Sequence, residues 1–164
     1  MTVCIAVRTE DNDVVCMTDT AIGLGNNRFN TPTIKGEYYG ADFIMWAGDV
    51  WCAQRVLRSD PAELTFQEAV DKYGKKYRDS EKHPVVPVDF LRVSPDRDIQ
   101  VWEGAGSCIV GFNYACIGHG SFTAWPLLDA LYKRLRKPTV YNVKRMLNEV
   151  GRLTEKYDST VYRP

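Results

Sequence analysis

The 164-residue sequence contains few histidines and no excess of charge of either sign. Its two histidines, His83 and His119, are few for a histidine-rich metal site and argue against a conventional Ser-His-Asp triad. The 21 Lys and Arg residues balance 21 Asp and Glu residues, so no overall field attracts a polyanion. We therefore expect no metal, no cofactor and no nucleic-acid partner.

Long apolar runs and common site motifs are also missing. No segment approaches the roughly 18 uninterrupted apolar residues of a membrane helix, and residues 1–5 lack the basic and apolar regions of a secretory signal. The sequence therefore predicts a cytoplasmic protein with no membrane partner. It has no G-x-S-x-G, H-E-x-x-H, P-loop or dinucleotide-binding motif, so an enzyme built on it needs another source of a catalytic base.

Cysteine is present, but without the patterns of metal or disulfide sites. The five cysteines form an odd set with no C-x-x-C pair, which favours buried, reduced thiols; they are Cys4, Cys16, Cys52, Cys108 and Cys116. A hydrophobic fraction of 45% with 26% charged residues indicates an ordinary globular protein. The length fits a single domain, residues 1–164, large enough to fold without a metal or disulfide.

Alternating apolar patterns predict several strands. Residues 3–8 and 14–18 form a hairpin around the turn-forming residues 10–13. The other strands that we expect are 42–47, a second hairpin of 88–93 and 99–102, the short strand 114–117, and an extended piece at 160–162.

Helical periodicity follows in separate blocks. Asp49 can cap a helix that begins at Val50, and a capping box at 65–68 precedes a helix over 66–77. Two later helices carry apolar faces over 124–135 and 143–157. Pro126 fits the first turn of the former, and Thr139 can cap the latter. Blocks of strands that alternate with blocks of helices predict a layered α+β domain.

The start of the chain offers a self-contained nucleophile and base. Removal of Met1 would leave Thr2 with a hydroxyl and a free α-amino group on one residue. An unperturbed α-amino group has a pKa of about 7.7–8.0, so near neutral pH much of it can accept the hydroxyl proton. Thr is common after an initiator Met, so this feature alone is a weak indication of catalysis.

Three further residues fit a site around Thr2. Asp19 ends the second strand of the hairpin and so returns to the end of the sheet where Thr2 begins. A buried Lys35 would favour a neutral amine and the developing alkoxide, while Asp19 would keep it charged and oriented. Gly48, between a strand and a helix, can offer an N–H to an oxyanion. A simpler interpretation also fits each position: Asp19 as a turn residue at a strand end, Lys35 as a solvated lysine, and Gly48 as a turn glycine.

Several short stretches recur in a known order and spacing: 2–7, 14–20, Lys35, 46–48 and 117–121. Together they resemble the landmarks of the proteasome β-type subunits and of the simpler HslV-type peptidases. The resemblance spans residues 2 to 160. It implies an N-terminal nucleophile (Ntn) hydrolase with a four-layer αββα sandwich.

The resemblance also implies roles for individual residues. Thr2 would be the nucleophile, Asp19 and Lys35 its supporting pair, and Gly48 the oxyanion donor. His119, in Gly118-His119-Gly120, takes the place of a serine that contacts the catalytic amine in the family, and Asp158 would help to hold that amine. The positions that would line the pocket for the main substrate side chain are Ile22, Trp46 and Val50.

The function that the resemblance implies is a threonine-type endopeptidase that works as a subunit of stacked homo-oligomeric rings. Its substrate would be an unfolded protein or a peptide, with an ATP-dependent unfoldase as a further partner. Two alternatives within the same fold are an Ntn amidohydrolase acting on a small amide and an inactive assembly or scaffold subunit. A third alternative is an unrelated α+β binding domain. Native mass and covalent labelling of Thr2 discriminate among them.

Overall fold

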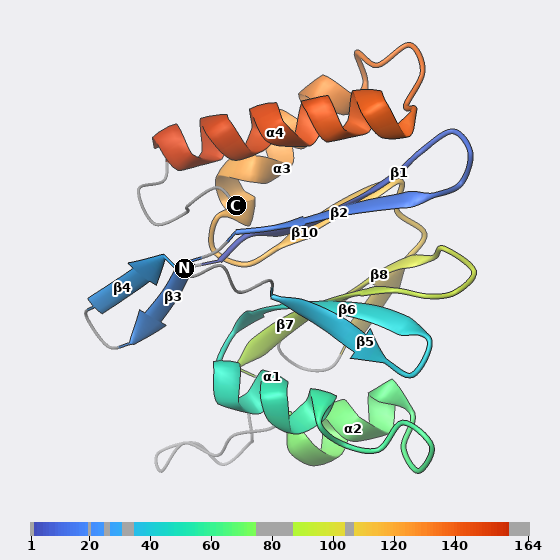
Figure 1. Ribbon diagram of the computed structural model, residues 1–164, viewed down its shortest axis with the longest axis vertical. Helices are drawn as coiled ribbons and strands as arrows, with labels where there is room; N and C mark the ends of the chain where they lie inside the picture. The colour runs from blue at the N-terminus through green and yellow to red at the C-terminus, as the bar shows by residue number, and fades with distance from the viewer. Residues whose placement is uncertain are drawn as a thin grey trace.

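The chain forms two facing β-sheets, each covered on its outer side by helices, as a computed structural model shows (Figure 1). The structure describes residues 2–19, 21–24, 27–30, 35–74, 87–103 and 107–157, without side chains for 21–30 and 107–110. Helices α3 and α4 lie over one sheet, and α1 and α2 lie over the other (Figure 1). The four-layer αββα sandwich expected from the sequence is confirmed.

The first sheet has three antiparallel strands in the order β10-β1-β2. The hairpin of β1 (Cys4–Arg8) and β2 (Val14–Thr18) pairs Cys4 with Thr18, and β10 (Tyr114–Ile117) pairs its last residue with Cys4 on the other side. Asn12 has a φ of 63° in the hairpin turn, a conformation that Asn tolerates better than most residues. The three predicted strands are therefore confirmed.

The second sheet has five antiparallel strands in the order β5-β6-β7-β8-β9. The sequence patterns predict its three central strands, β6 (Asp42–Gly48), β7 (Val88–Val93) and β8 (Ile99–Glu103). They do not predict the edge strands β5 (Gly36–Tyr39) and β9 (Ser107–Val110), or a separate hairpin of β3 (Ala21–Leu24) and β4 (Asn27–Asn30). The predicted piece at 160–162 lies outside the described residues.

Three apolar clusters fill the three spaces between the layers. Alternation along β1 divides its side chains between two of them, because Val3, Ile5 and Val7 face α3 and α4 whereas Cys4 and Ala6 face the second sheet. The third cluster lies between the second sheet and the helices α1 and α2. Strand β1 is therefore buried on both faces, and it leads back through Val3 to Thr2.

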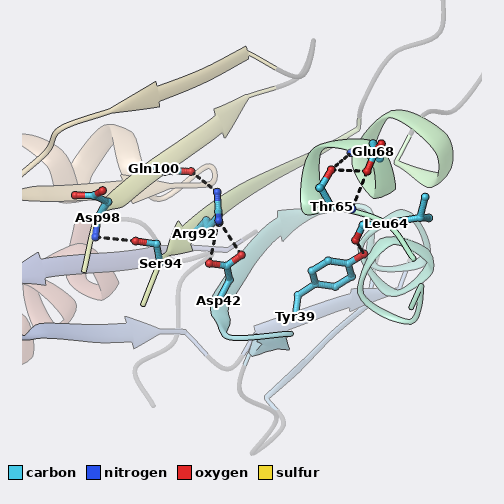
Figure 2. A network of polar contacts seen from close by, with 9 residues as sticks. All are labelled: Tyr39, Asp42, Leu64, Thr65, Glu68, Arg92, Ser94, Asp98 and Gln100. Carbon is cyan, nitrogen blue, oxygen red and sulfur yellow. Dashed lines mark hydrogen bonds and ion pairs between the residues drawn. The ribbon is translucent and has the colours of Figure 1, made fainter. Parts of the chain in front are cut away.

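Helix α1 (Val50–Leu57) begins as predicted, with Asp49 accepting a hydrogen bond from the N–H of Cys52 at 3.0 Å. Helix α2 (Phe66–Tyr73) has the expected capping box, in which Thr65 and Glu68 exchange hydrogen bonds (Figure 2). The predicted extension of α2 to residue 77 is wrong within the described chain, because the helix ends at Tyr73 and Gly74 caps it. Residues 75–77 themselves are outside the described part.

Helix α3 (Ser121–Tyr132) begins earlier than the position of Pro126 suggests. The prediction that Pro126 lies in the first turn is wrong, because Pro126 is the sixth residue of the helix. Gly120 is the N-cap of the helix, and its carbonyl accepts a hydrogen bond from the N–H of Ala124 at 2.9 Å. Because proline has no N–H, the carbonyl of Phe122 lacks its usual donor four residues on. The first turn of α3 is therefore less tightly bonded than the rest.

Helix α4 (Val140–Tyr157) is capped by Thr139 as predicted, since Thr139 Oγ1 accepts from the N–H of Asn142 at 3.3 Å. Among the described residues, no helix is both long and apolar enough to cross a membrane.

Polar contacts at the side of the second sheet tie its strands together (Figure 2). Arg92 on β7 donates to Asp42 on β6 at 3.0 Å and to Gln100 on β8 at 2.9 Å. Tyr39 on β5 donates to the carbonyl of Leu64, which joins the sheet to the segment before α2. These bonds lie toward the end of β6 opposite Gly48 and link β6, β7 and β8 to one another and β5 to the segment before α2.

Candidate active site

Five segments converge at one end of the sandwich (Figure 1). Thr2 precedes β1, Asp19 follows β2 and Lys35 precedes β5. Gly48 ends β6, and residues 118–120 join β10 to α3. Antiparallel pairing brings these strand ends together, because β1 begins where β2 and β10 end.

Lys35 lies between Thr2 and Asp19 and bonds to both. Its Nζ donates to Thr2 Oγ1 at 2.7 Å and to Asp19 Oδ1 at 2.8 Å. The lysine and the aspartate are 5% and 1% exposed, so water does little to screen their attraction. The hydroxyl of Thr2 therefore receives a charge-assisted hydrogen bond from a buried ion pair.

Asp19 is held by the backbone of β1 as well as by Lys35. Its N–H donates to the carbonyl of Val3 at 3.0 Å, and its Oδ1 accepts from the N–H of Val3 at 3.3 Å. Burial raises the pKa of Asp19 above 3.8, against the opposing effect of its bond with Lys35. Its Oδ2 is buried and has no hydrogen-bond partner within the described part of the chain.

This arrangement favours negative charge on the Thr2 oxygen. An ammonium at 2.7 Å stabilises an alkoxide more than a neutral hydroxyl, and the low-polarity surroundings strengthen that difference. Asp19 keeps the lysine from standing as an uncompensated buried charge. Lys35 donates to this hydroxyl, and no histidine within the described ranges bonds to it.

Gly48 occupies a position that only glycine can fill. Its φ is +117°, and a Cβ there would lie 2.4 Å from the carbonyl oxygen of Pro87. The N–H of Asp49, just after β6, donates to the carbonyl of Pro87, just before β7, whereas the N–H of Trp46 on β6 donates to the carbonyl of Lys35 on the opposite side. Because N–H groups alternate along a strand, the N–H of Gly48 points to the side of Lys35. That direction suits an oxyanion donor beside Thr2.

The segment 118–120 wraps the carbonyl of Thr2. A Cβ on Gly118, which has a φ of +91°, would lie 2.2 Å from that oxygen and 2.9 Å from Ala47 Cβ. Gly120 donates its N–H to the same oxygen at 3.2 Å. Sequence reasoning did not single out the packing role of Gly118, although a Gly-x-Gly after a strand is a signal of close backbone approach.

His119 lies between Gly118 and Gly120, the two residues that approach the carbonyl oxygen of Thr2. Its side chain is exposed, and its ring meets the edge of Phe122 at a centroid distance of 6.0 Å and an angle of 74°. No hydrogen bond joins the imidazole to another described residue. The structure therefore places His119 beside the backbone of Thr2, with its ring against α3.

The remaining candidate residues are less closely associated with Thr2. Trp46 is 7% exposed and packs among the residues between the second sheet and α1 and α2, on the opposite face of β6 from Met45 and Ala47. Val50 is half-buried at the start of α1, two residues after Gly48. The side chain of Ile22 and the whole of Asp158 lie outside the described residues.

A buried thiol, Cys4, lies next to the site, as expected for a cysteine in an apolar run. Cys4 is fully buried, and its Sγ donates to the carbonyl of Trp46 at 3.2 Å, which ties β1 to β6 across the two sheets. Burial raises the pKa of this thiol far above its ordinary value. Cys4 is therefore an inert packing group, and nothing in the sequence distinguishes it from the other cysteines in apolar runs.

Within the described ranges, no group of three or more His, Cys, Asp or Glu side chains is arranged so that it could hold a metal ion. The described cysteines, Cys4, Cys16, Cys52 and Cys116, form no disulfide with one another.

The comparisons with known proteins found matches among solved structures, at low sequence identity. No family model matches it, and no curated protein matches it. The Thiobacillus denitrificans protein BPH has 16% identity and a TM-score of 0.71, with 100% of this chain and 94% of that chain covered. The same protein in complex with epoxomicin gives 16% identity and a TM-score of 0.70 over the same shares.

Eukaryotic HslV from Trypanosoma brucei has 17% identity and a TM-score of 0.71, with 98% of this chain and 94% of that chain covered. The alignment thus extends over nearly the whole of both chains, although few residues are identical. The resemblance noted in the sequence is confirmed at the level of the fold: the chain has an HslV-like fold.

Proposed function

We propose that the chain is a threonine-type endopeptidase in which Thr2, freed by removal of Met1, is the nucleophile. The observation that carries the proposal is the buried chain of contacts from Asp19 through Lys35 to Thr2 Oγ1, at 2.8 and 2.7 Å. A buried lysine bonded to the hydroxyl of the second residue has a high cost in desolvation. A function that needs an activated hydroxyl accounts for it.

The proposed reaction is acyl transfer to Thr2. Oγ1 attacks the carbonyl carbon of the substrate, its proton passes to the α-amino group of Thr2, and the carbonyl oxygen becomes an oxyanion. The C–N bond then breaks as the ammonium returns the proton to the departing amine, which leaves an ester on Thr2. Water, deprotonated by the same amine, hydrolyses the ester and restores the hydroxyl.

Lys35 and Gly48 have separate electrostatic roles in this mechanism. The ammonium of Lys35 stabilises charge on Oγ1, and the N–H of Gly48 donates to the substrate oxyanion. Asp19 positions Lys35. Lys35 already bonds to Oγ1 before any substrate is bound, so its contact needs little reorganisation.

Removal of Met1 is essential to this proposal. While Met1 is attached, the nitrogen of Thr2 belongs to an amide, which neither accepts a proton nor carries a charge. The roles of Asp158 and His119 near the amine, and of Ile22, Trp46 and Val50 in the substrate pocket, follow from the family resemblance and remain proposals.

We further propose that the protein works as a homo-oligomer, in stacked rings that confine unfolded protein or peptide substrates in a chamber in the cytoplasm. The fold supports this proposal, and an ATP-dependent unfoldase is the partner that the HslV resemblance implies. Native mass measurement tests the assembly, since a monomer would contradict it and a mass of twelve or more chains would support it.

Covalent labelling tests the chemistry. Epoxomicin is bound by the Thiobacillus protein, and as an α,β-epoxyketone it reacts with a residue that carries both a hydroxyl and a free amine. Purified protein that begins at Thr2 should gain the full mass of the probe on its N-terminal peptide, because the addition expels no group. Thr2→Ala is the matched control and should remain unlabelled. An unlabelled parent protein, shown to begin at Thr2, would refute the proposal and favour a scaffold role.

A further inference from the structure

An exposed aromatic pair adjoins the proposed nucleophile on the side of α3. Gly118 and Gly120 both contact the carbonyl oxygen of Thr2, which fixes His119 between them. The ring of His119 meets Phe122 edge to face, at 6.0 Å and 74°. Phe122, in the first turn of α3, is 81% exposed, the highest exposure of any large hydrophobic side chain in the described chain.

The core does not account for Phe122. Helix α3 packs on the first sheet through Ala124 and Leu128, which are fully buried, while Phe122 faces away from them. An exposed phenylalanine is common when isolated, but this one contacts a second aromatic ring beside the reacting residue. Aromatic rings that pair edge to face provide a rigid apolar surface for a further ring or aliphatic group.

The two sheets divide the surroundings of Thr2 into two sides. Lys35, Gly48 and Val50 come from the second sheet and α1. His119 and Phe122 come from the end of β10 and the start of α3. In the proposed reaction the oxyanion lies toward Gly48, and the expected side-chain pocket lies beside Val50. The acyl part of the substrate therefore occupies the α1 side, which leaves the α3 side for the departing part.

We propose that His119 and Phe122 bind the side chain of the residue that follows the scissile bond, and that they favour an aromatic or large aliphatic residue there. This inference rests on the proposed peptidase function and adds a specificity on the leaving-group side. Phe122 supplies the apolar contact, and His119 orients its ring.

Paired peptides test this specificity. Internally quenched peptides should be identical except for Phe or Ala after the scissile bond, and mass spectrometry of the products should verify the bond cleaved. We expect kcat/KM of the parent protein to be about tenfold higher for Phe than for Ala, the discrimination of an apolar contact of this size. Phe122→Ala should reduce that ratio to within about twofold.

A matched control separates this effect from a general loss of an exposed ring. Tyr141 on α4 is 68% exposed and contacts Arg145 rather than the site. Tyr141→Ala should leave the ratio unchanged. The inference is overturned if parent protein shows no preference for Phe, or if Phe122→Ala retains it.

Two further readouts keep this inference distinct from the proposed function. Epoxomicin mimics the acyl side alone, so Phe122→Ala should be labelled at the parent rate; failure of the parent protein to be labelled would instead refute the peptidase proposal. Native mass should also be equal for parent and variant. A smaller assembly with an unchanged peptide preference would show that Phe122 is a subunit contact and would overturn the inference.

Discussion

Replacing Lys35 by methionine, which is similar in length but uncharged, separates the electrostatic role of the lysine from its packing. The change removes the bond from Nζ to Thr2 Oγ1 at 2.7 Å and the ion pair with Asp19 at 2.8 Å. Loss of one preorganised donor to a developing oxyanion lowers kcat by about 10²–10³, or about 2.7–4 kcal/mol. We expect a loss of this size or larger in the turnover of a fluorogenic peptide.

The same change has a separate effect on stability. Asp19 is 1% exposed and would lose its counter-ion, and breaking one side of a buried pair costs about 3–5 kcal/mol in the free energy of unfolding. Because the pKa of Asp19 is already raised by burial, the variant should recover part of this loss at lower pH, where the carboxyl is protonated. A carboxyl whose pKa is higher in the folded state than in the unfolded state binds protons more tightly when folded. The free energy of unfolding therefore rises as the pH falls through that pKa.

A double variant distinguishes catalysis from stability. Adding Asp19→Asn to Lys35→Met removes the unpaired charge, so urea denaturation should show that stability is largely regained while turnover stays low. Full kcat in Lys35→Met, measured on protein shown to be folded, would refute the electrostatic role of Lys35. A double variant that recovers activity along with stability would show that the lysine acts through the fold alone.

Three other changes test the packing and capping of the fold. Gly118→Ala should lower the free energy of unfolding by about 1–3 kcal/mol in urea titrations and reduce turnover, because its φ is +91° and its Cβ would meet the carbonyl of Thr2; wild-type stability would refute this contact. The pKa of Glu68 is lowered because Thr65 donates to it, so the stability that this carboxylate contributes is present above pH 4.5 and is lost as the pH falls through its pKa in the folded state. Glu68→Gln should weaken the dependence of the free energy of unfolding on pH in this acid range, and an unchanged dependence would contradict the role of Glu68. Phe90→Ala should cost about 3–5 kcal/mol by the same titration, since the ring is fully buried; a cost under about 1 kcal/mol would show that the cavity collapses.

Apolar sequence patterns predicted the elements in which the apolar residues are the buried ones. Strands β1, β6 and β7 carry β-branched and apolar residues with at least one buried face, which is the signal that strand prediction depends on. The hairpin β3–β4 was missed because its Gly and Asn residues disfavour strands in isolation, so backbone pairing rather than side-chain pattern identifies it. Edge strand β5 was missed because its two central residues are exposed, so its sequence does not alternate between apolar and polar residues.

Part of the candidate site could be predicted from pairing alone. Thr2 and Asp19 flank one hairpin, so their proximity follows from the register of β1 and β2. The contact of Lys35 could not be derived in this way, because it depends on how the second sheet stacks on the first. The burial of Trp46 toward α1 and α2 follows the alternation of β6, and only the three-dimensional packing shows how little of that side chain reaches the surface.

The central claim, that the free amine of Thr2 is the catalytic base, is tested most directly by varying the fraction of chains that begin at Thr2. Preparations with different degrees of Met1 removal should be measured by intact mass spectrometry and, in parallel, for turnover of one fluorogenic peptide. The account predicts that specific activity rises in proportion to the Thr2-initiated fraction and extrapolates to zero when Met1 is fully retained. Equal activity in fully retained and fully trimmed protein would contradict it.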